Sequence, residues 1–207
     1  MKRHLICTLA LSVLGATATS VAAAPAAERA ALKNESYRAA DGSRVLQQSI
    51  ELPAPLAEAW AAFTTTEGFR AWAAPVAKVE MRLGGFIEAS YDPDAKIGAP
   101  GNIRNEIVAF VPQRMLAMRN RQAPPNTAFD AAAFQTLHTV VLFEPLGERR
   151  TRVTIAQPGY PAGEPWDTVY RQFEAGNGWS LSQLHKRFVE GPADWSRLRT
   201  PPPVETR

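Results

Sequence analysis

Glu164 to Glu190 reads EPWDTVYRQFEAGNGWSLSQLHKRFVE, and this stretch decides the fold. Within it, one set of side chains recurs at steps of three or four residues: Trp166, Tyr170, Phe173, Asn177, Leu181, Leu184 and Phe188. That spacing places the whole set on one face of a helix of about 25 residues. All but Asn177 are large and apolar or aromatic. The stretch therefore predicts a long helix that packs this face against the rest of the protein.

Asn177 lies at the centre of this apolar face, between Gly176 and Gly178. A buried amide without hydrogen-bond partners costs about 1–3 kcal/mol, so Asn177 needs a partner. One hypothesis is that it binds a carbonyl or hydroxyl group of a ligand inside a cavity. The other is that it bonds to a nearby backbone group, a side chain or a buried water. Both hypotheses stay open at this point.

The rest of the chain predicts one strand, two short helices and then a run of antiparallel strands. Strands are expected at residues 44–52, 78–82, 86–91, 101–111, 115–121, 136–143 and 150–156, short helices at 56–63 and 67–72, and a Pro-containing loop at 122–133. Strands followed by one long helix are typical of an α+β fold in two layers. We expect a strongly curved antiparallel sheet of about six strands that grips the C-terminal helix and leaves a cavity between them.

Residues 1–23 have the layout of a secretory signal peptide. A basic start is followed by an apolar run from Leu5 to Leu14 and then by small residues, with Val21 and Ala23 as the expected cleavage signal. The apolar run is too short to span a bilayer comfortably. We therefore expect a periplasmic or secreted protein with no stable membrane anchor after cleavage.

Charge and cysteine content exclude several kinds of partner. The formal net charge is +3, and Lys2 and Arg3 lie inside the expected signal peptide. The other basic residues are scattered, apart from Arg149, Arg150 and Arg152, which have Glu148 beside them, and this argues against a nucleic-acid partner. Cys7 is the only cysteine and also lies in the signal peptide, so we expect neither disulfides nor a cysteine metal site in the mature chain. The sequence does not determine the oligomeric state.

Familiar catalytic motifs are absent from the sequence. It contains no HExxH, P-loop or GxGxxG motif, and no carboxylate spacing around its histidines indicates a metal site, so we expect no metal and no cofactor. His138 lies in a strand with two apolar faces. It is either a general base in the cavity or a structural or surface histidine. His185 lies near a helix end with other basic residues, and we assign it no catalytic role.

Asn105 and Glu106 form a polar pair in the strand expected at 101–111. Successive side chains of a strand point to opposite faces. If Ile103 and Ile107 face the cavity, Asn105 does too, and Glu106 faces solvent beside a basic neighbour. A buried Glu106 would instead be a candidate acid with a raised pKa.

Several stretches occur in an order that resembles a known family. They are Pro55-Leu56 followed by Trp60 and Phe63-Thr64-Thr65, Gly68 with Trp72, Arg82 with Gly84-Gly85, Asn105-Glu106-Ile107 with Pro112 and Met115-Leu116, Thr151-Arg152-Val153, and Gly176 with Leu181 and Leu184. Together these stretches resemble the activator-of-heat-shock-ATPase-like branch of the START/Bet v 1-like (SRPBCC) superfamily. The resemblance covers about residues 44–190. It rests on order and spacing, because none of the motifs is highly specific by itself.

The resemblance implies a helix-grip fold, with the order β-α-α-β(5 or 6)-α around an apolar cavity. It also implies small-molecule or lipid binding in most branches, co-chaperone action in the branch that lends the name, and cyclase-type enzymes in some others. The chain departs from the family in two places. Gly176-Asn177 stands where members commonly have Gly-Trp, which replaces a bulky ring by a small amide. The signal peptide separates the protein from the cytosolic chaperone and its ATP.

We therefore expect an exported protein that binds a small hydrophobic or amphipathic molecule. The binding domain is expected at 44–190, after a flexible leader at 24–43 and before a C-terminal tail at 191–207. One alternative is a polyketide-cyclase/hydrolase-like enzyme that polarises a carbonyl with Asn177, Tyr170 or His138. A second alternative is a protein-interaction (co-chaperone-like) module that uses the convex surface of the sheet.

The candidate ligand-binding residues are mainly the aromatic side chains, joined by a few polar and aliphatic ones. They are Trp60, Phe63, Trp72, Phe86, Tyr91, Asn105, Ile107, His138, Trp166, Tyr170, Phe173, Asn177 and Leu181. The cavity of this fold lies inside the core, so the same residues are also expected to build the core. Convergence of two or more titratable side chains would favour the enzyme, and a contiguous exposed apolar patch would favour the interaction module.

Overall fold

The computed structural model describes residues 32–123 and 130–196, so the expected signal peptide lies outside the described residues. The helices are α1 (Leu56–Thr64), α2 (Thr66–Arg70), α3 (Ala131–Thr136) and α4 (Trp166–Glu190). The strands are β1 (Lys33–Asn34), β2 (Tyr37–Arg38), β3 (Arg44–Leu52), β4 (Val76–Val79), β5 (Phe86–Ser90), β6 (Ile103–Val111), β7 (Met115–Gln122), β8 (His138–Pro145) and β9 (Thr151–Tyr160). These strands form one sheet in the order β1-β3-β9-β8-β7-β6-β5-β4, and β2 also pairs with β3.

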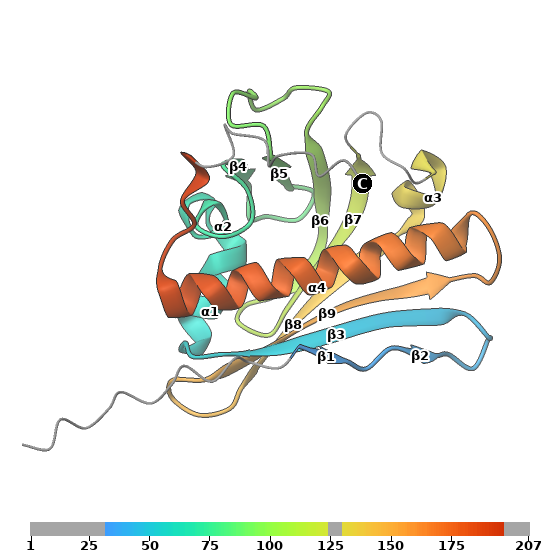
Figure 1. Ribbon diagram of the computed structural model, residues 1–207, viewed down its shortest axis with the longest axis horizontal. Helices are drawn as coiled ribbons and strands as arrows, with labels where there is room; N and C mark the ends of the chain where they lie inside the picture. Colours follow the sequence, from blue (N-terminus) through green and yellow to red (C-terminus); the bar gives the residue numbers. More distant parts are fainter. Residues whose placement is uncertain (1–31, 124–129, 197–207) are drawn as a thin grey trace, which may run out of the picture.

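The sheet curves around α4, and α4 runs along the length of β3 and β9 (Figure 1). All neighbouring strands are antiparallel. This arrangement is the helix grip, and the expected α+β fold is confirmed. The described sheet has nine strands instead of about six, and two of them are the two-residue strands β1 and β2.

The chain from Lys33 onward pairs with the sheet, within the segment 24–43 that was expected to be a flexible leader. Lys33 pairs with Ser49 of β3, and Tyr37 pairs with Val45. The Ser49 hydroxyl also donates to a carboxylate oxygen of Glu35 at 2.9 Å. The sequence offers no apolar periodicity here, because β1 and β2 are short, exposed edge strands. Residues 24–31 lie outside the described residues.

The first residues of the expected tail pack against α2. The Ala193 N–H donates to the Ala71 carbonyl at 2.8 Å, and the Trp195 indole N–H donates to the Arg70 carbonyl at 2.7 Å. The chain up to Ser196 is thus anchored on the domain, while residues 197–207 lie outside the described residues.

The helix α4 has the length that its apolar face predicts. Leu181 and Leu184 are fully buried, and Gly191 ends the helix with a φ of 99°, which glycine adopts without strain. Gly178 leaves room for Leu32, the residue before β1, since a Cβ at position 178 would lie 3.1 Å from Leu32 Cδ2. In the described part of the chain, no helix combines the length and apolarity that a membrane span requires.

Two groups of buried side chains hold α4 on the sheet, one toward each end. The first joins α1, α2 and the C-terminal half of α4 and includes Trp60, Phe63, Trp72, Phe143, Leu181 and Leu184. The second surrounds the N-terminal half of α4 and includes Leu46, Tyr160, Trp166, Val169, Tyr170 and Phe173. Arg44 reinforces the second group, because its guanidinium pairs with Asp167 at 2.7 Å and lies 4.7 Å from the Tyr170 ring centroid.

The strand β9 extends past Pro158 to Tyr160, although Pro158 was expected to lie beyond the strand. The register between β3 and β9 shifts between Arg44 and Leu46. Such an irregularity, close to the end of the ladder, accommodates a proline, which has no N–H to donate. The extension brings Gln157 into the sheet, opposite Leu46.

The helix α3 was not expected, because its sequence lies at the end of a Pro-containing loop. Asp130 caps the helix, and its Oδ1 accepts a hydrogen bond from the Ala133 N–H at 2.7 Å. Ala133 and Phe134 are buried beside α4. The alanine-rich run favours a helix locally, and packing of this face fixes it in place.

Candidate functional site: a cavity under the C-terminal helix

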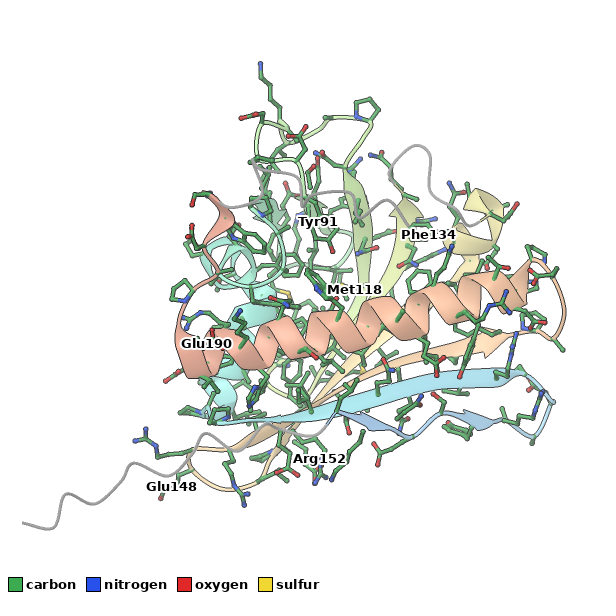
Figure 2. The ribbon with its side chains drawn as sticks, viewed as in Figure 1. Tyr91, Met118, Phe134, Glu148, Arg152 and Glu190 are labelled. Carbon is green, nitrogen blue, oxygen red and sulfur yellow. The ribbon has the colours of Figure 1, made fainter. Side chains whose placement is uncertain are left out.

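A cavity of about 470 Å³ lies between α4 and the concave face of the sheet. Its apolar walls come from the sheet, the α1–α2 region, α3 and α4: Phe63, Phe69, Trp72, Ile87, Ile103, Met118, Phe134, Val141, Ile155, Phe173 and Trp179. Figure 2 shows Tyr91, Met118 and Phe134 together on the side of α4 that faces β5, β6 and β7. A smaller hollow of about 130 Å³ shares Trp72, Tyr91 and Asn105 with the cavity and continues it toward Ala73, Ala74 and the β5 residue Ala89.

Tyr91 and Trp179 border the cavity where it meets solvent. Their rings contact each other edge to face, with centroids 6.1 Å apart, and they link the end of β5 to α4. Tyr91 is 49% exposed and Trp179 is 45% exposed, whereas Ile87 and Ile155 in the same lining are buried. The two aromatic rings therefore form the entrance of the cavity.

Gln157 of β9 organises a hydrogen-bond network in the cavity wall. It is almost fully buried, and its Oε1 accepts hydrogen bonds from the Tyr160 hydroxyl at 3.0 Å and from Asn177 Nδ2 at 2.9 Å. Its Nε2 donates to Thr139 Oγ1 at 2.9 Å. Burial raises the pKa of Tyr160 above its ordinary value, so this hydroxyl keeps its proton and acts as a donor. The network ties β8, β9 and α4 together.

Asn177 thus has a partner inside the protein. The hypothesis that it bonds to a neighbouring side chain is confirmed by its hydrogen bond to Gln157, although Asn177 also lines the cavity. The Asn177 amide supplies one donor to Gln157.

Three other amides line the cavity: Asn105 of β6, Asn120 of β7 and Gln172 of α4. Asn105 Oδ1, Asn120 Nδ2 and Gln172 Oε1 are buried and have no hydrogen-bond partner among residues 32–123 and 130–196. Asn105 and Asn120 are register partners on adjacent strands, so their side chains lie on the same face of the sheet. These two amides form the most polar part of an otherwise apolar wall.

The orientation expected for β6 is confirmed. Ile103 and Asn105 line the cavity, and Ile107 continues the same face into the core. Glu106 points the other way and forms a salt bridge with Arg121. The alternative that Glu106 is a buried acid in the cavity is therefore wrong.

The cavity lining carries almost no ionisable groups. Among the described residues that line it, there is no Asp, Glu, His, Lys or Arg. Tyr91 is the one ionisable side chain in that lining, and burial raises its pKa, so it is uncharged at neutral pH. The described residues also contain no group of three or more His, Cys, Asp or Glu side chains placed to hold a metal ion.

The structure brings together part of the candidate set. Phe63, Trp72, Tyr91, Asn105, Phe173 and Asn177 line the cavity. Trp60, Ile107 and Leu181 pack in the core instead, and Trp166 and Tyr170 pack around Tyr160 near the start of α4. Phe86 lies outside the cavity, with the Arg104 guanidinium 4.1 Å from its ring centroid. His138 is exposed, while its neighbours Thr139 and Val141 line the cavity.

Sequence reasoning missed the amides that matter most for polar recognition. Asn120 lies next to charged residues in the sequence, but its register pairing with Asn105 turns it toward the cavity. Gln157 lies beyond the expected end of its strand. Gln172 is one residue before Phe173 and lies at the border of the predicted apolar face of the helix. The strict alternation of β7, with Met118 and Asn120 on one face, is the signal that predicts the position of Asn120.

A curved antiparallel sheet that grips one long helix, with an apolar cavity between them, defines the helix-grip class of proteins. Residues 53–188 match the family described as "Activator of Hsp90 ATPase homolog 1-like protein". The chain therefore belongs to this family, a branch of the SRPBCC superfamily, as the resemblance of its motifs implied.

Solved structures share the fold at low sequence identity. An Aha1 dimer from Colwellia psychrerythraea matches with a TM-score of 0.55 and 12% identity, over 72% of this chain and 98% of that chain. CalU16 from Micromonospora echinospora matches with a TM-score of 0.54 and 16% identity, over 82% of this chain and 90% of that chain. A conserved protein of unknown function from Enterococcus faecalis matches with a TM-score of 0.53 and 14% identity, over 79% of this chain and 85% of that chain. No curated protein sequence matches the chain.

Proposed function

We propose that the protein is an exported binding protein that holds a small hydrophobic or amphipathic molecule between its sheet and α4. The cavity itself carries this proposal. Its volume of about 470 Å³ lies within the range of roughly 300–1,000 Å³ that is common for ligand sites. Aromatic and aliphatic walls with a few polar groups are also the composition expected of such sites. Membership of a superfamily whose branches mostly bind small molecules or lipids supports the same function.

Export is the part of the proposal that rests on the sequence of residues 1–23. Their basic start, apolar run and small residues have the pattern of a signal peptide. An exported protein does not meet a cytosolic chaperone or its ATP. We therefore do not transfer to this chain the activity that the family description names.

An acid–base enzyme is less well supported than a binding protein. Such an enzyme places at least two titratable groups within reach of one substrate position. The described lining of the cavity offers Tyr91 alone, at its entrance. His138 does not face the cavity, and Tyr170 packs against Tyr160 at a ring distance of 5.2 Å. Of the three residues proposed to polarise a carbonyl, only Asn177 lines the cavity.

Protein interaction is the second candidate function, because one surface feature favours it. Val111, Met115 and Leu142 are register partners on β6, β7 and β8, and they form an apolar row on the sheet face that points away from α4. Val111 is 50% exposed and Leu142 is 41% exposed. The substitution Leu142→Lys separates the two functions: it disrupts a protein contact on this row but leaves the affinity for a cavity ligand unchanged.

Ligand binding predicts a saturable response to the neutral fluorescent probe N-phenyl-1-naphthylamine. Emission of this probe rises in apolar surroundings, so we expect an increase that saturates at one probe per chain. An excess of naphthalene should reverse the increase by competition. Stoichiometry is measured by titration at a protein concentration above the Kd. An increase that never saturates, or one that persists in urea-unfolded protein, would show that the cavity is not a binding site.

A further inference from the structure

The cavity wall contains one donor and two acceptors that the described protein leaves without partners. The donor is Asn120 Nδ2, and the acceptors are Asn105 Oδ1 and Gln172 Oε1. Asn120 is only 3% exposed, so bulk water has little access to it. Unpaired polar groups of this kind are costly, and a ligand that pairs with them gains affinity from doing so. The three atoms therefore indicate which chemical groups the cavity selects.

The two asparagines lie side by side on the sheet. They are register partners on β6 and β7, and directly opposed side chains in such a ladder have Cβ atoms about 4.5–5.5 Å apart. A single ligand atom placed over this pair can reach both amides. That atom must accept from Asn120 Nδ2, and a hydrogen attached to it must be donated to Asn105 Oδ1. Gln172 belongs to α4 on the opposite wall, where its Oε1 can accept from a second donor.

Charged groups do not meet these requirements. A carboxylate has no hydrogen to donate to Asn105 or Gln172, and the described lining holds no cation to compensate its buried charge. An ammonium group has no lone pair for Asn120, and the lining holds no carboxylate to balance it. A hydroxyl or a primary amide both donates and accepts without carrying a charge. These neutral groups fit the pair of asparagines.

We propose that the ligand is an uncharged molecule with an apolar body and a hydroxyl or primary amide group, which binds between Asn105 and Asn120. This inference rests on the proposed binding function and specifies the class of ligand. The apolar body occupies the space between Met118, Val141 and Phe173. Asn177 already uses one of its N–H groups within the protein, because its Nδ2 donates to Gln157.

Three probes with the same ring system test the proposal: naphthalene, 2-naphthol and 2-naphthoate. Each competes with N-phenyl-1-naphthylamine at neutral pH, and its Kd follows from the displacement curve. We expect 2-naphthol to bind about tenfold more tightly than naphthalene, because it adds hydrogen bonds to buried amides without adding charge. We expect 2-naphthoate to bind at least about tenfold more weakly than 2-naphthol, because its charge is buried without a partner.

Variants then test whether Asn105 and Asn120 cause the preference for 2-naphthol over naphthalene. The substitutions Asn105→Leu and Asn120→Leu should each reduce the preference for 2-naphthol, and the double variant should bring the ratio of the two Kd values close to one. Affinity for naphthalene should stay the same or rise in these variants. The matched control is His138→Leu, a polar residue that is exposed and does not line the cavity, which should keep the wild-type ratio.

The outcomes separate this inference from the proposed function. Equal affinity of wild-type protein for naphthalene and 2-naphthol would overturn the inference and leave ligand binding intact. A preference that persists in the double variant would also overturn it. Failure of wild-type protein to bind any of the probes would contradict the binding function itself. The ratio of the Kd values of naphthalene and 2-naphthol is measured on wild-type protein. This part of the test therefore stands even if a leucine substitution prevents folding.

Discussion

Gly176→Phe is expected to abolish probe binding, with a loss of affinity of at least about 100-fold. Gly176 lies in the stretch of α4 that lines the cavity, together with Gln172, Phe173, Asn177 and Ser180. Gly176 lies at the solvent-exposed border of the cavity, and a Cβ at this position would meet no heavy atom within 4 Å, so a phenyl ring is accommodated there without a clash. A phenyl ring there occupies volume that the ligand needs. Titration with N-phenyl-1-naphthylamine measures the effect.

Gly176→Ala is the matched control for this substitution. A methyl group fills little of the cavity, so the affinity should stay within about twofold of the wild-type value. The variant should also be more stable by up to about 1 kcal/mol, because alanine favours a helix over glycine. If Gly176→Phe bound the probe as well as Gly176→Ala does, the ligand would not occupy the space beneath α4.

Gln157→Leu is expected to lower the free energy of unfolding by about 3 kcal/mol. The substitution leaves the Tyr160 hydroxyl, Asn177 Nδ2 and Thr139 Oγ1 without the bonds that they make to Gln157. Tyr160 is fully buried, so its hydroxyl has no access to water as a replacement. Urea denaturation followed by circular dichroism gives the free energy of unfolding for both proteins.

Asn177→Leu tests how much a single member of the Gln157 network contributes to stability. It removes a single donor to Gln157 Oε1, which keeps its hydrogen bond from Tyr160. We expect a change within about 1 kcal/mol of wild type, since a lost bond is balanced by burial of apolar surface. Equal losses of stability in Gln157→Leu and Asn177→Leu would argue against Gln157 as the centre of the network.

The long helix and the class of fold follow from the sequence because their signals are local. The apolar face of α4 repeats at helical spacing over the whole element, and Gly191 marks its end. The strand β3 has the expected bounds for a similar reason, since prolines follow it directly. The edge strands β1 and β2 carry no such signal, because each contributes only two residues that are held by pairing with β3.

The candidate site was predictable only in part. A strand residue lines the cavity only if its side chain lies on the face of the strand that points inward. Phe86 and Tyr91 were both proposed, yet five positions separate them, and strand alternation places such residues on opposite faces. Tyr91 shares its face with Ile87, and both line the cavity, whereas Phe86 lies under Arg104. Alternation alone shows that only one of the two lines the cavity, and the fold decides that it is Tyr91.

Other parts of the site depend on contacts that no local pattern reveals. Asn120 lines the cavity because the register of β6 and β7 places it beside Asn105. Gln157 lies in the wall because β9 continues to Tyr160 after the register shift opposite β3. The partner of Asn177 is twenty positions away in the sequence, and only the folded chain brings the two together.

Native mass spectrometry of the protein purified from its own cells tests the central claim most directly. We predict that the extracellular or periplasmic fraction contains a chain that has lost its first 23 residues and carries one uncharged small molecule. Organic extraction should release that molecule, and the Gly176→Phe variant prepared in the same way should lack it. A wild-type protein that shows the bare polypeptide mass, identical in ligand content to Gly176→Phe, would contradict the claim that this cavity holds a ligand.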